Sequence, residues 1–382
     1  MTAPIVIIGG GMAAGHAAVE LRENGYDGEL VVFADEPHPP YERPPLSKGY
    51  LAGKASLEDT YLKPLEWYGE HRIDVRPGTR VDSIDTDAHL VRTAEGSQPF
   101  SKLLIATGAQ PRRLPVPGTD HIEVAYLRSI DDSRRLHERL TPGARLLVVG
   151  GGWIGMEVAS TARELGAEVV LVEPTEQPLL KVLGPELGER LADVHRKHGV
   201  DLRTRTSLET LRDRVAVLSD GTEAEVDTVV IGVGAAPDDA LAGEAGLDAD
   251  NGILVDAGLR TSHPDVFAAG DVANHAHPLL GERVRVEHWQ SAVSRGKFAA
   301  HALMGEPGAY DELPFFFSDQ YDLGLEYFGH PGAAGYDAVK IDEGSGDSLV
   351  ARWYRGDLLV AAMHVNDWDV SDELKEQVRA AR

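Results

Sequence analysis

The stretch IVIIGGGMAAGHAA, residues 5–18, decides the fold class of this chain. An apolar run enters three glycines and then an Ala-rich segment, so that Gly9, Gly11 and Ala14 fit the dinucleotide-binding pattern G-x-G-x-x-G/A. In that pattern the first glycine forms a tight turn, the second lets the backbone approach a pyrophosphate, and the N-terminus of the following helix faces the anion. The next predicted strand ends in two acids able to hold a ribose, Asp35 and Glu36.

The same arrangement recurs in RLLVVGGGWIGMEVAS, residues 145–160, where Gly150, Gly152 and Gly155 satisfy the pattern. Glu173 ends the next predicted strand at about the usual distance from the glycines, and a carboxylate there accepts from a ribose 2′-hydroxyl and repels a 2′-phosphate. The PTEQP that follows contains no arginine, which favours NADH over NADPH. Two such units predict two dinucleotides, a flavin and a nicotinamide, with hydride passing between them.

The composition excludes several classes of function. A net charge of −25 argues against nucleic-acid binding, which needs a basic face. No apolar run reaches the roughly 18 residues of a membrane span, and the opening MTAPIVIIGG resembles a strand rather than a signal peptide, so we expect a cytoplasmic protein without membrane contact. The chain has no cysteine, which excludes redox dithiols and thiolate nucleophiles. Its histidines lack the spacing of metal ligands, and we expect no metal.

The order of predicted elements indicates three domains. Residues 36–70 form a proline-rich loop that interrupts the first α/β unit, and such loops are usually functional. VFAAGDVA then predicts a buried strand that ends at Gly270 and Asp271, whose carboxylate holds either a cofactor group or simply a helix N-terminus. After residue 310 the pattern changes to antiparallel strands and one closing helix. The predicted domains are 1–109 with 235–310, 110–234, and 311–382.

Helices are expected at four places where apolar residues recur with helical spacing or a turn signal closes the segment. These ranges are 12–23, a segment from the second glycine turn to about 165, about 185–198, and about 290–303, with a short closing helix over 371–381.

Taken together, these stretches resemble the FAD-dependent ferredoxin and rubredoxin reductases of the glutathione-reductase structural family. YERPPLSKGYL, LLIATGAQPR, GGGWIGMEVAS, VVIGVGAAP, RVEHWQSA and PFFFSDQYDLGLEYFGH carry the resemblance, which spans nearly the whole chain. It implies an α/β fold with two Rossmann-like domains, one for FAD and one for NAD, and a C-terminal α+β domain. It also implies an NADH-dependent reductase that passes electrons through FAD to a [2Fe–2S] ferredoxin or a rubredoxin serving an oxygenase, as a monomer or homodimer.

The resemblance also implies two sets of cofactor-binding residues. Those expected around FAD are Gly9, Gly11, Met12, Ala13, Ala14, Asp35, Glu36, Arg43, Lys48, Val81, Ala106, Thr107, Gly108, Arg128, Gly270, Asp271, His288 and Trp289. Those expected around NAD are Gly150, Gly152, Trp153, Ile154, Gly155, Glu173 and Gly234. Three residues have simpler alternatives: Lys48 as a solvated loop lysine, Arg43 as a residue that pins its own loop, and Trp289 as a core aromatic. Trp153 either covers the nicotinamide pocket or packs its own helix.

Glu157 lies more than one turn into the second predicted helix, beyond the residues that meet a pyrophosphate. Because a buried carboxylate without a partner costs several kcal/mol, we expect it to be paired. The resemblance places Lys48 opposite it, and we predict a Lys48–Glu157 ion pair across two domains as the catalytic pair beside the flavin. A basic patch for an acidic electron carrier is expected at Arg283, Arg285, Arg295 and Lys297.

Two other functions remain open at this point. One is an NADH oxidase, or a quinone or dye reductase, that hands electrons to oxygen or to a small molecule. The other is a redox-signalling flavoprotein like apoptosis-inducing factor, which shares the three-domain plan.

Overall fold

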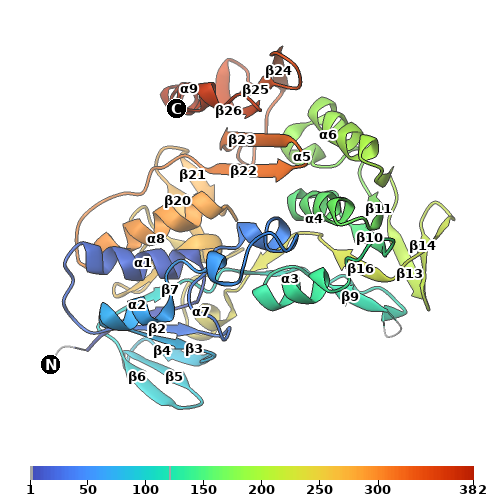
Figure 1. Ribbon diagram of the computed structural model, residues 1–382. Helices are drawn as coiled ribbons and strands as arrows, with labels where there is room; N and C mark the ends of the chain where they lie inside the picture. The colour runs from blue at the N-terminus through green and yellow to red at the C-terminus, as the bar shows by residue number, and fades with distance from the viewer. Residues whose placement is uncertain (1–2, 120–121) are drawn as a thin grey trace.

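The computed structural model describes residues 3–119 and 122–382 and is built around two parallel sheets (Figure 1). The first sheet has the strand order β19-β7-β1-β2-β3, with the strand of the first glycine turn, β1, at its centre. Helices α1 and α8 pack against each other over one face, and a three-stranded meander lies on the other side (Figure 1). The strands are β1 (Ile5–Ile8), β2 (Leu30–Ala34), β3 (Ile73–Pro77), β7 (Lys102–Ile105) and β19 (Val266–Ala268), the meander β4 (Val81–Asp85), β5 (Leu90–Thr93) and β6 (Gly96–Pro99), and the helices α1 (Met12–Glu23), α2 (Leu65–Glu70), α7 (Ala240–Glu244), α8 (Trp289–Leu303), η1 (Pro44–Ser47) and η2 (Glu58–Thr60).

The second sheet repeats this plan. Its order is β12-β11-β10-β16-β9, so that β10, the strand of the second glycine turn, again lies at the centre with its sequence neighbour on one side. The strands are β9 (Glu123–Ala125), β10 (Arg145–Val149), β11 (Glu168–Glu173), β12 (Asp201–Thr204) and β16 (Thr228–Ile231), the meander β13 (Leu208–Arg212), β14 (Val215–Leu218) and β15 (Glu223–Glu225), and the helices α3 (Ile130–His137), α4 (Trp153–Glu164), α5 (Leu180–Leu183) and α6 (Pro185–Lys197). The predicted α/β class with parallel sheets is confirmed.

The chain crosses between the two sheets at one antiparallel pair of strands, β8 (Ala109–Pro111) and β17 (Ala235–Pro237). The predicted domain bounds at 109/110 and 234/235 fall on these strands, and the division into domains stays a prediction. After β17 the chain returns to the first unit through β18 (Ile253–Val255), η4 (Gly270–Val272), β20 (Ala273–His277) and β21 (Glu282–Val284).

The C-terminal part is an antiparallel sheet of order β22-β23-β26-β25-β24. Figure 1 shows β22 above α4 and α8, the helices of the two parallel-sheet units, and β22 contacts both. Trp353 of this sheet is fully buried, and its indole N–H donates to the Leu183 carbonyl of the second unit at 3.3 Å. The two parts therefore share one apolar core. Its elements are β22 (Phe315–Gln320), β23 (Leu323–Gly329), β24 (Ala338–Glu343), β25 (Leu349–Arg355), β26 (Leu358–Val365), η5 (Trp368–Val370) and α9 (Ser371–Ala380).

The predicted helices are confirmed as α1, α4, α6, α8 and α9, with bounds that differ by about one residue. Helix α3 was not predicted, although Ser129 and Asp132 form a capping box at its start that is visible in the sequence. Within residues 3–119 and 122–382, no helix is long and apolar enough to cross a membrane.

A substitution at Gly296 can test how closely α8 must approach α1. A Cβ at this position would lie 2.4 Å from the Ala13 carbonyl oxygen, in the helix that follows the first glycine turn. Gly296→Ala should therefore destabilise the protein by about 1–3 kcal/mol through overpacking, and a lower thermal midpoint would report it. Gly243→Ala in α7 is the control, because a Cβ there meets nothing within 4 Å. An equal midpoint for both variants would contradict the close approach.

Candidate functional site

A cavity of about 540 Å³ lies between the first glycine turn and the start of α4, the helix that follows the second turn. Its walls come from the first turn and the loop before η1, from the start of α4, and from β22. The turns follow β1 and β10, so the cavity lies at the carboxyl ends of both parallel sheets, where open α/β sheets bind ligands.

Both glycine turns have the geometry that the sequence predicts. Gly9 has φ +134°, and a Cβ on it would lie 2.2 Å from the Ala106 carbonyl oxygen. Gly150 has φ +106°, and a Cβ on it would lie 2.4 Å from the Gly232 oxygen. Helices α1 and α4 begin without a side-chain cap and without an acidic residue in the first turn. Each helix start therefore leaves backbone N–H groups and a positive dipole end for an anion.

The two acids after β2 have different surroundings. Glu36 accepts from the Arg43 guanidinium at 3.0 Å and from the Tyr41 hydroxyl at 2.6 Å, and burial raises the pKa of Tyr41, which keeps that hydroxyl a donor. Asp35 is exposed and pairs with Arg80 at 3.5 Å. Arg43 also donates to the Arg128 carbonyl, so this arginine both pins its loop and lines the cavity.

The carboxylate of Glu173 is bound at the second turn. One oxygen accepts from the Gly151 N–H at 2.7 Å, and the other from the N–H and hydroxyl of Thr175 at 2.9 and 2.7 Å. Glu173 lies beside the turn and does not line the cavity. The PTEQP that follows Glu173 contains no arginine, but the residue directly after the neighbouring strand β12 supplies one. Arg205 donates its backbone N–H to the Thr175 carbonyl, and its guanidinium pairs with Glu176 at 3.0 Å.

Asp271 lines the cavity and pairs with Arg128 at 3.3 Å. Its side chain caps no helix, since the residue at the N-cap of η4 is Ala269 and it has no side-chain bond. The alternative of an ordinary helix cap is therefore wrong. Arg128 lies above Gly108, where a Cβ would meet its guanidinium at 2.8 Å.

The predicted ion pair is present at the centre of the cavity. Lys48 Nζ lies 2.8 Å from Glu157 Oε2, and the side chains are 20% and 5% exposed, so Lys48 is not a solvated loop lysine. Glu157 also accepts from the hydroxyls of Ser47 at 2.5 Å and Ser318 at 2.7 Å. The ammonium of Lys48 lies 5.6 Å from the centre of the Phe317 ring.

Aromatic side chains close the cavity on the side of β22. Phe316 packs against Trp153 and His288, with ring centres 4.7 and 5.0 Å apart, and Trp289 meets Phe317 edge to face. His288 Nδ1 and Trp289 Nε1 are buried without a hydrogen-bond partner among the described residues. Buried polar groups of this kind are usually bonded, and both residues line the cavity, which fits a polar ligand there.

The donors and acceptors around the cavity fit a long dinucleotide. Open helix starts suit its diphosphate, carboxylates suit its riboses, and Arg43, Arg128 and Lys48 supply positive charge along the wall. Within residues 3–119 and 122–382, no group of three or more His, Asp or Glu side chains lies together as a metal site.

Most predicted site residues meet at this cavity. Those that line it are Gly9, Gly11, Met12, Ala13, Asp35, Glu36, Arg43, Lys48, Val81, Ala106, Thr107, Gly108, Arg128, Trp153, Ile154, Glu157, Gly270, Asp271, His288 and Trp289. Those that lie outside its lining are Ala14, Gly150, Gly152, Gly155, Glu173 and Gly234. Whether the residues of either set bind the cofactors assigned to them stays a prediction.

Sequence reasoning missed Ser47, Ser318, Phe316 and Phe317. All four lie in stretches already singled out, and Ser47 directly precedes Lys48, but nothing in the sequence shows that β22 lies against α4.

One expectation about the surface is wrong. Arg295 is 1% exposed, because α8 turns it inward against Tyr310, and it cannot contact a partner.

Comparisons with known proteins extend along the whole chain. The family model described as pyridine nucleotide-disulphide oxidoreductase matches residues 3–296. The ferredoxin–NAD(+) reductase component of the anthranilate 1,2-dioxygenase system of Burkholderia cepacia is 39% identical over 368 residues, which cover 95% of this chain and 91% of that protein. Rhodocoxin reductase of Rhodococcus erythropolis is 37% identical over 348 residues, 90% of this chain and 82% of that protein. The crystal structure of the covalent putidaredoxin reductase–putidaredoxin complex matches with a TM-score of 0.93 at 32% identity, covering 99% of this chain and 93% of that chain.

The burial of His288 predicts a pH dependence of stability. Burial lowers the pKa of His288 to about 3, against 6.5 for a free histidine. Between these values the unfolded chain binds a proton that the folded chain excludes, so stability falls as the pH falls below about 6.5. At pH 5 this histidine should cost about 2 kcal/mol, and His288→Gln should remove that part of the loss in thermal midpoint between pH 7.5 and 5. His71→Gln, at an exposed position, should behave like the unaltered protein. If the thermal midpoint of His288→Gln fell between pH 7.5 and 5 by as much as that of the unaltered protein, this account would be wrong.

Proposed function

Because the chain belongs to the pyridine nucleotide-disulphide oxidoreductase family, we propose that it is an NADH-dependent, FAD-containing reductase that passes electrons to a small iron–sulfur protein. The acceptor is a [2Fe–2S] ferredoxin or a rubredoxin that serves an oxygenase. The observation that carries the proposal is a cavity that reaches from the first glycine turn to the start of α4, the helix that follows the second turn, with a lysine–glutamate pair in its wall.

The family name refers to disulphides, but this chain contains no cysteine. Reduction of a disulfide through a redox dithiol is therefore unavailable to it, since such a relay needs two thiols in the protein. The relatives that the chain matches over nearly its full length are reductases of ferredoxin and rhodocoxin by name. Electrons that leave toward a separate carrier protein account for both observations.

The lining residues suit FAD along the first turn and NADH at the start of α4. FAD supplies the conversion between a two-electron hydride donor and one-electron carriers. The start of α1 receives the diphosphate, Glu36 the adenosine ribose, and Arg128 with Asp271 the ribityl region. The start of α4 receives the nicotinamide dinucleotide, and Ile154 and Val233, two of the few exposed large apolar side chains, lie beside its turn.

The chain itself contributes position and charge to the reaction. Lys48 presents its ammonium to the cavity while Glu157 and the two serines hold its direction. A fixed positive charge in a partly dry site stabilises negative charge that develops on reduction. Trp153, Phe316 and His288 exclude water from the place where the two dinucleotides meet.

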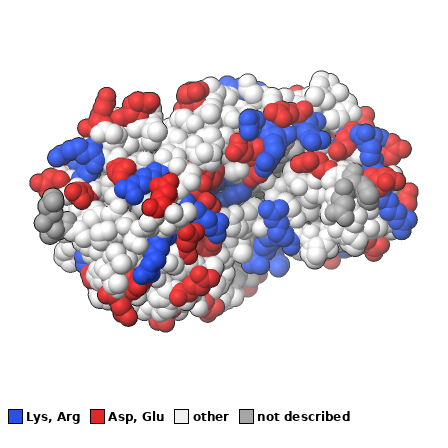
Figure 2. Space-filling model, turned by 90° about the horizontal axis from the view of Figure 1, so that it is seen from below, with Lys and Arg blue, Asp and Glu red and all other residues white. Residues whose placement is uncertain are grey.

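An acidic carrier needs a local basic surface here, because the net charge of −25 repels it at long range. The face in Figure 2 carries acidic and basic side chains side by side rather than one sign. Of the four basic residues expected to dock a carrier, Arg283 and Lys297 remain exposed. A cytoplasmic location and a monomeric or homodimeric state stay predictions.

The choice of acceptor can be measured directly. With FAD bound, NADH oxidation should accelerate strongly on addition of a [2Fe–2S] ferredoxin or a rubredoxin, followed through cytochrome c reduction, and should stay slow with oxygen alone. Lys48→Met should slow reduction of the flavin by NADH while FAD stays bound. Turnover with oxygen or a quinone that no iron–sulfur protein increases would favour an oxidase or quinone reductase. Slow turnover with every acceptor would favour a signalling flavoprotein.

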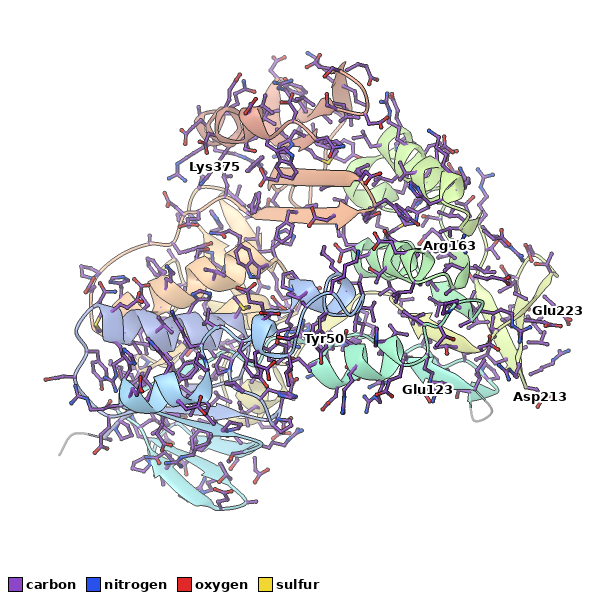
Figure 3. All side chains as sticks on the ribbon, in the orientation of Figure 1. Tyr50, Glu123, Arg163, Asp213, Glu223 and Lys375 are labelled. Carbon is purple, nitrogen blue, oxygen red and sulfur yellow. The ribbon has the colours of Figure 1, made fainter. Side chains whose placement is uncertain are left out.

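Glu173 predicts the choice of nicotinamide coenzyme. Its carboxylate is held at the second glycine turn, where we expect the ribose of the coenzyme, and there it would repel a 2′-phosphate. Glu173→Gln should therefore raise the ratio of kcat/KM for NADPH to that for NADH by about tenfold. Adding Arg205→Ala should reverse part of the gain, because the Arg205 guanidinium is a cation at Glu176, next to Thr175. Glu223→Gln, an exposed acid of the same unit that Figure 3 labels on β15, should leave the ratio unchanged. An unaltered ratio in Glu173→Gln would remove Glu173 from this role.

A further inference from the structure

The hydrogen bonds of Glu157 continue beyond the cavity along a buried chain of side chains. Ser318 Oγ lies 2.7 Å from Glu157 Oε1, and Gln320 Nε2 lies 3.1 Å from Ser318 Oγ. Gln320 Oε1 in turn lies 2.8 Å from His195 Nε2, and His195 Nδ1 lies 3.5 Å from the Tyr321 hydroxyl. Ser318, Gln320 and His195 are each at most 1% exposed, so water does not compete for these bonds.

The charge of Glu157 sets the direction of every bond in this chain. An ionised carboxylate only accepts, so Ser318 donates to it and must accept from the amide N–H of Gln320. The amide oxygen of Gln320 then faces His195, whose Nε2 must carry the proton. All the donors therefore point toward Glu157, and bonds aligned in this way strengthen one another.

These hydrogen bonds join three elements, two helices of the second parallel-sheet unit and one strand of the C-terminal sheet. Glu157 lies in α4, Ser318 and Gln320 in β22, and His195 in α6, and Figure 1 shows the β22–β23 hairpin running past α4 toward α6. The turn of this hairpin is also fixed to α4. Tyr321, in the turn, has φ +56°, and its backbone N–H donates to Ser160 Oγ of α4 at 3.0 Å.

The outer end of the chain is also held. The Tyr321 ring stacks on His198 with centres 3.7 Å apart. Arg163, labelled in Figure 3 on α4, donates to the His198 carbonyl at 3.0 Å and ties that helix to the end of α6. The donors that reach Glu157 are thus supported from the surface inward.

We propose that Gln320 and His195 are positioning residues for the Lys48–Glu157 pair. Their aligned donors hold the Glu157 carboxylate in one orientation and disperse its charge, which leaves the Lys48 ammonium free to face the flavin. An amide does not pass protons along such a chain at ordinary pH, so the chain orients the pair and does not conduct protons. This inference rests on the proposed function, because the flavin is the group that Lys48 serves.

The first test compares four variants with the flavin bound. His195→Leu and Gln320→Leu should slow the anaerobic reduction of the flavin by NADH by about tenfold, the size expected for one lost bond to a charged group. The flavin midpoint potential should become more negative, because Glu157 then shields Lys48. His195→Gln retains a donor and should recover most of the rate. His275→Leu is the control, since His275 is equally buried and forms no hydrogen bond with Glu157, Ser318, Gln320 or His195.

Equal rates and potentials in His195→Leu and His275→Leu would overturn the inference. If NADH does not reduce the flavin of the unaltered protein, the proposed function fails. That result is distinct from one in which the unaltered protein is active but the hydrogen bonds to Glu157 have no effect.

A second test observes the hydrogen bonds of His195 directly by NMR, without enzyme turnover. In protein labelled with ¹⁵N-histidine, the buried Nε2–H of His195 should give a slowly exchanging signal that is absent from His195→Gln. Glu157→Gln replaces the terminal acceptor by a group that also donates, so the order of donors is no longer forced, and the His195 signal should move or disappear. A signal unchanged in both Glu157→Gln and Ser318→Ala would show that His195 does not sense Glu157 and would overturn the inference.

Discussion

A buried carboxylate that needs donors constrains the centre of this molecule. Glu157 is almost fully buried, and an ionised group at such a place is tolerated only when it is paired and hydrogen-bonded. Its partners come from the loop at Ser47 and Lys48 and from Ser318 in the C-terminal sheet, 110 and 161 residues away from it for the two serines. The two parallel-sheet units and the C-terminal sheet must therefore meet at one side chain, and they meet where the cavity passes from the first glycine turn to the start of α4.

The duplication of the α/β unit follows from the same geometry. A parallel sheet offers its phosphate site at the carboxyl ends of its strands, next to the central strand, and each sheet offers one such site. β1 and β10 occupy equivalent central places, and the two sheets correspond in four of their five strands, so two dinucleotides require two sheets with those ends turned toward one cavity. The chain makes the two crossings side by side, as β8 and β17, and a paired crossing of this kind holds the two sites in a defined relation.

Local patterns in the sequence predicted the fold well, because a glycine turn between a strand and a helix is read from adjacent residues. The Lys48–Glu157 pair could be predicted only from the family resemblance together with the rule that buried charge is paired. Ser318 and Arg205 were missed for a common reason: each reaches its partner through strand placement, β22 against α4 and β12 beside β11, which no local pattern encodes. Arg295 was misplaced because charge suggests exposure, whereas the contact of Gly296 with Ala13 brings this part of α8 into the interior.

Helix α4 both follows a glycine turn and holds neighbouring parts of the protein together. Its first residues follow the glycine turn, and Trp153, Glu157, Thr161 and Glu164 then recur at spacings that place them on one face. Trp153 packs on Phe316, Thr161 donates to the Ser47 carbonyl at 2.8 Å, and Glu164 pairs with Lys54 at 2.7 Å. A face of directional bonds admits one register, whereas a purely apolar face could shift by a fraction of a turn. Because hydride transfer requires the reacting atoms to lie within about 3–3.5 Å, a helix fixed in register would help to hold two bound dinucleotides at a reactive distance.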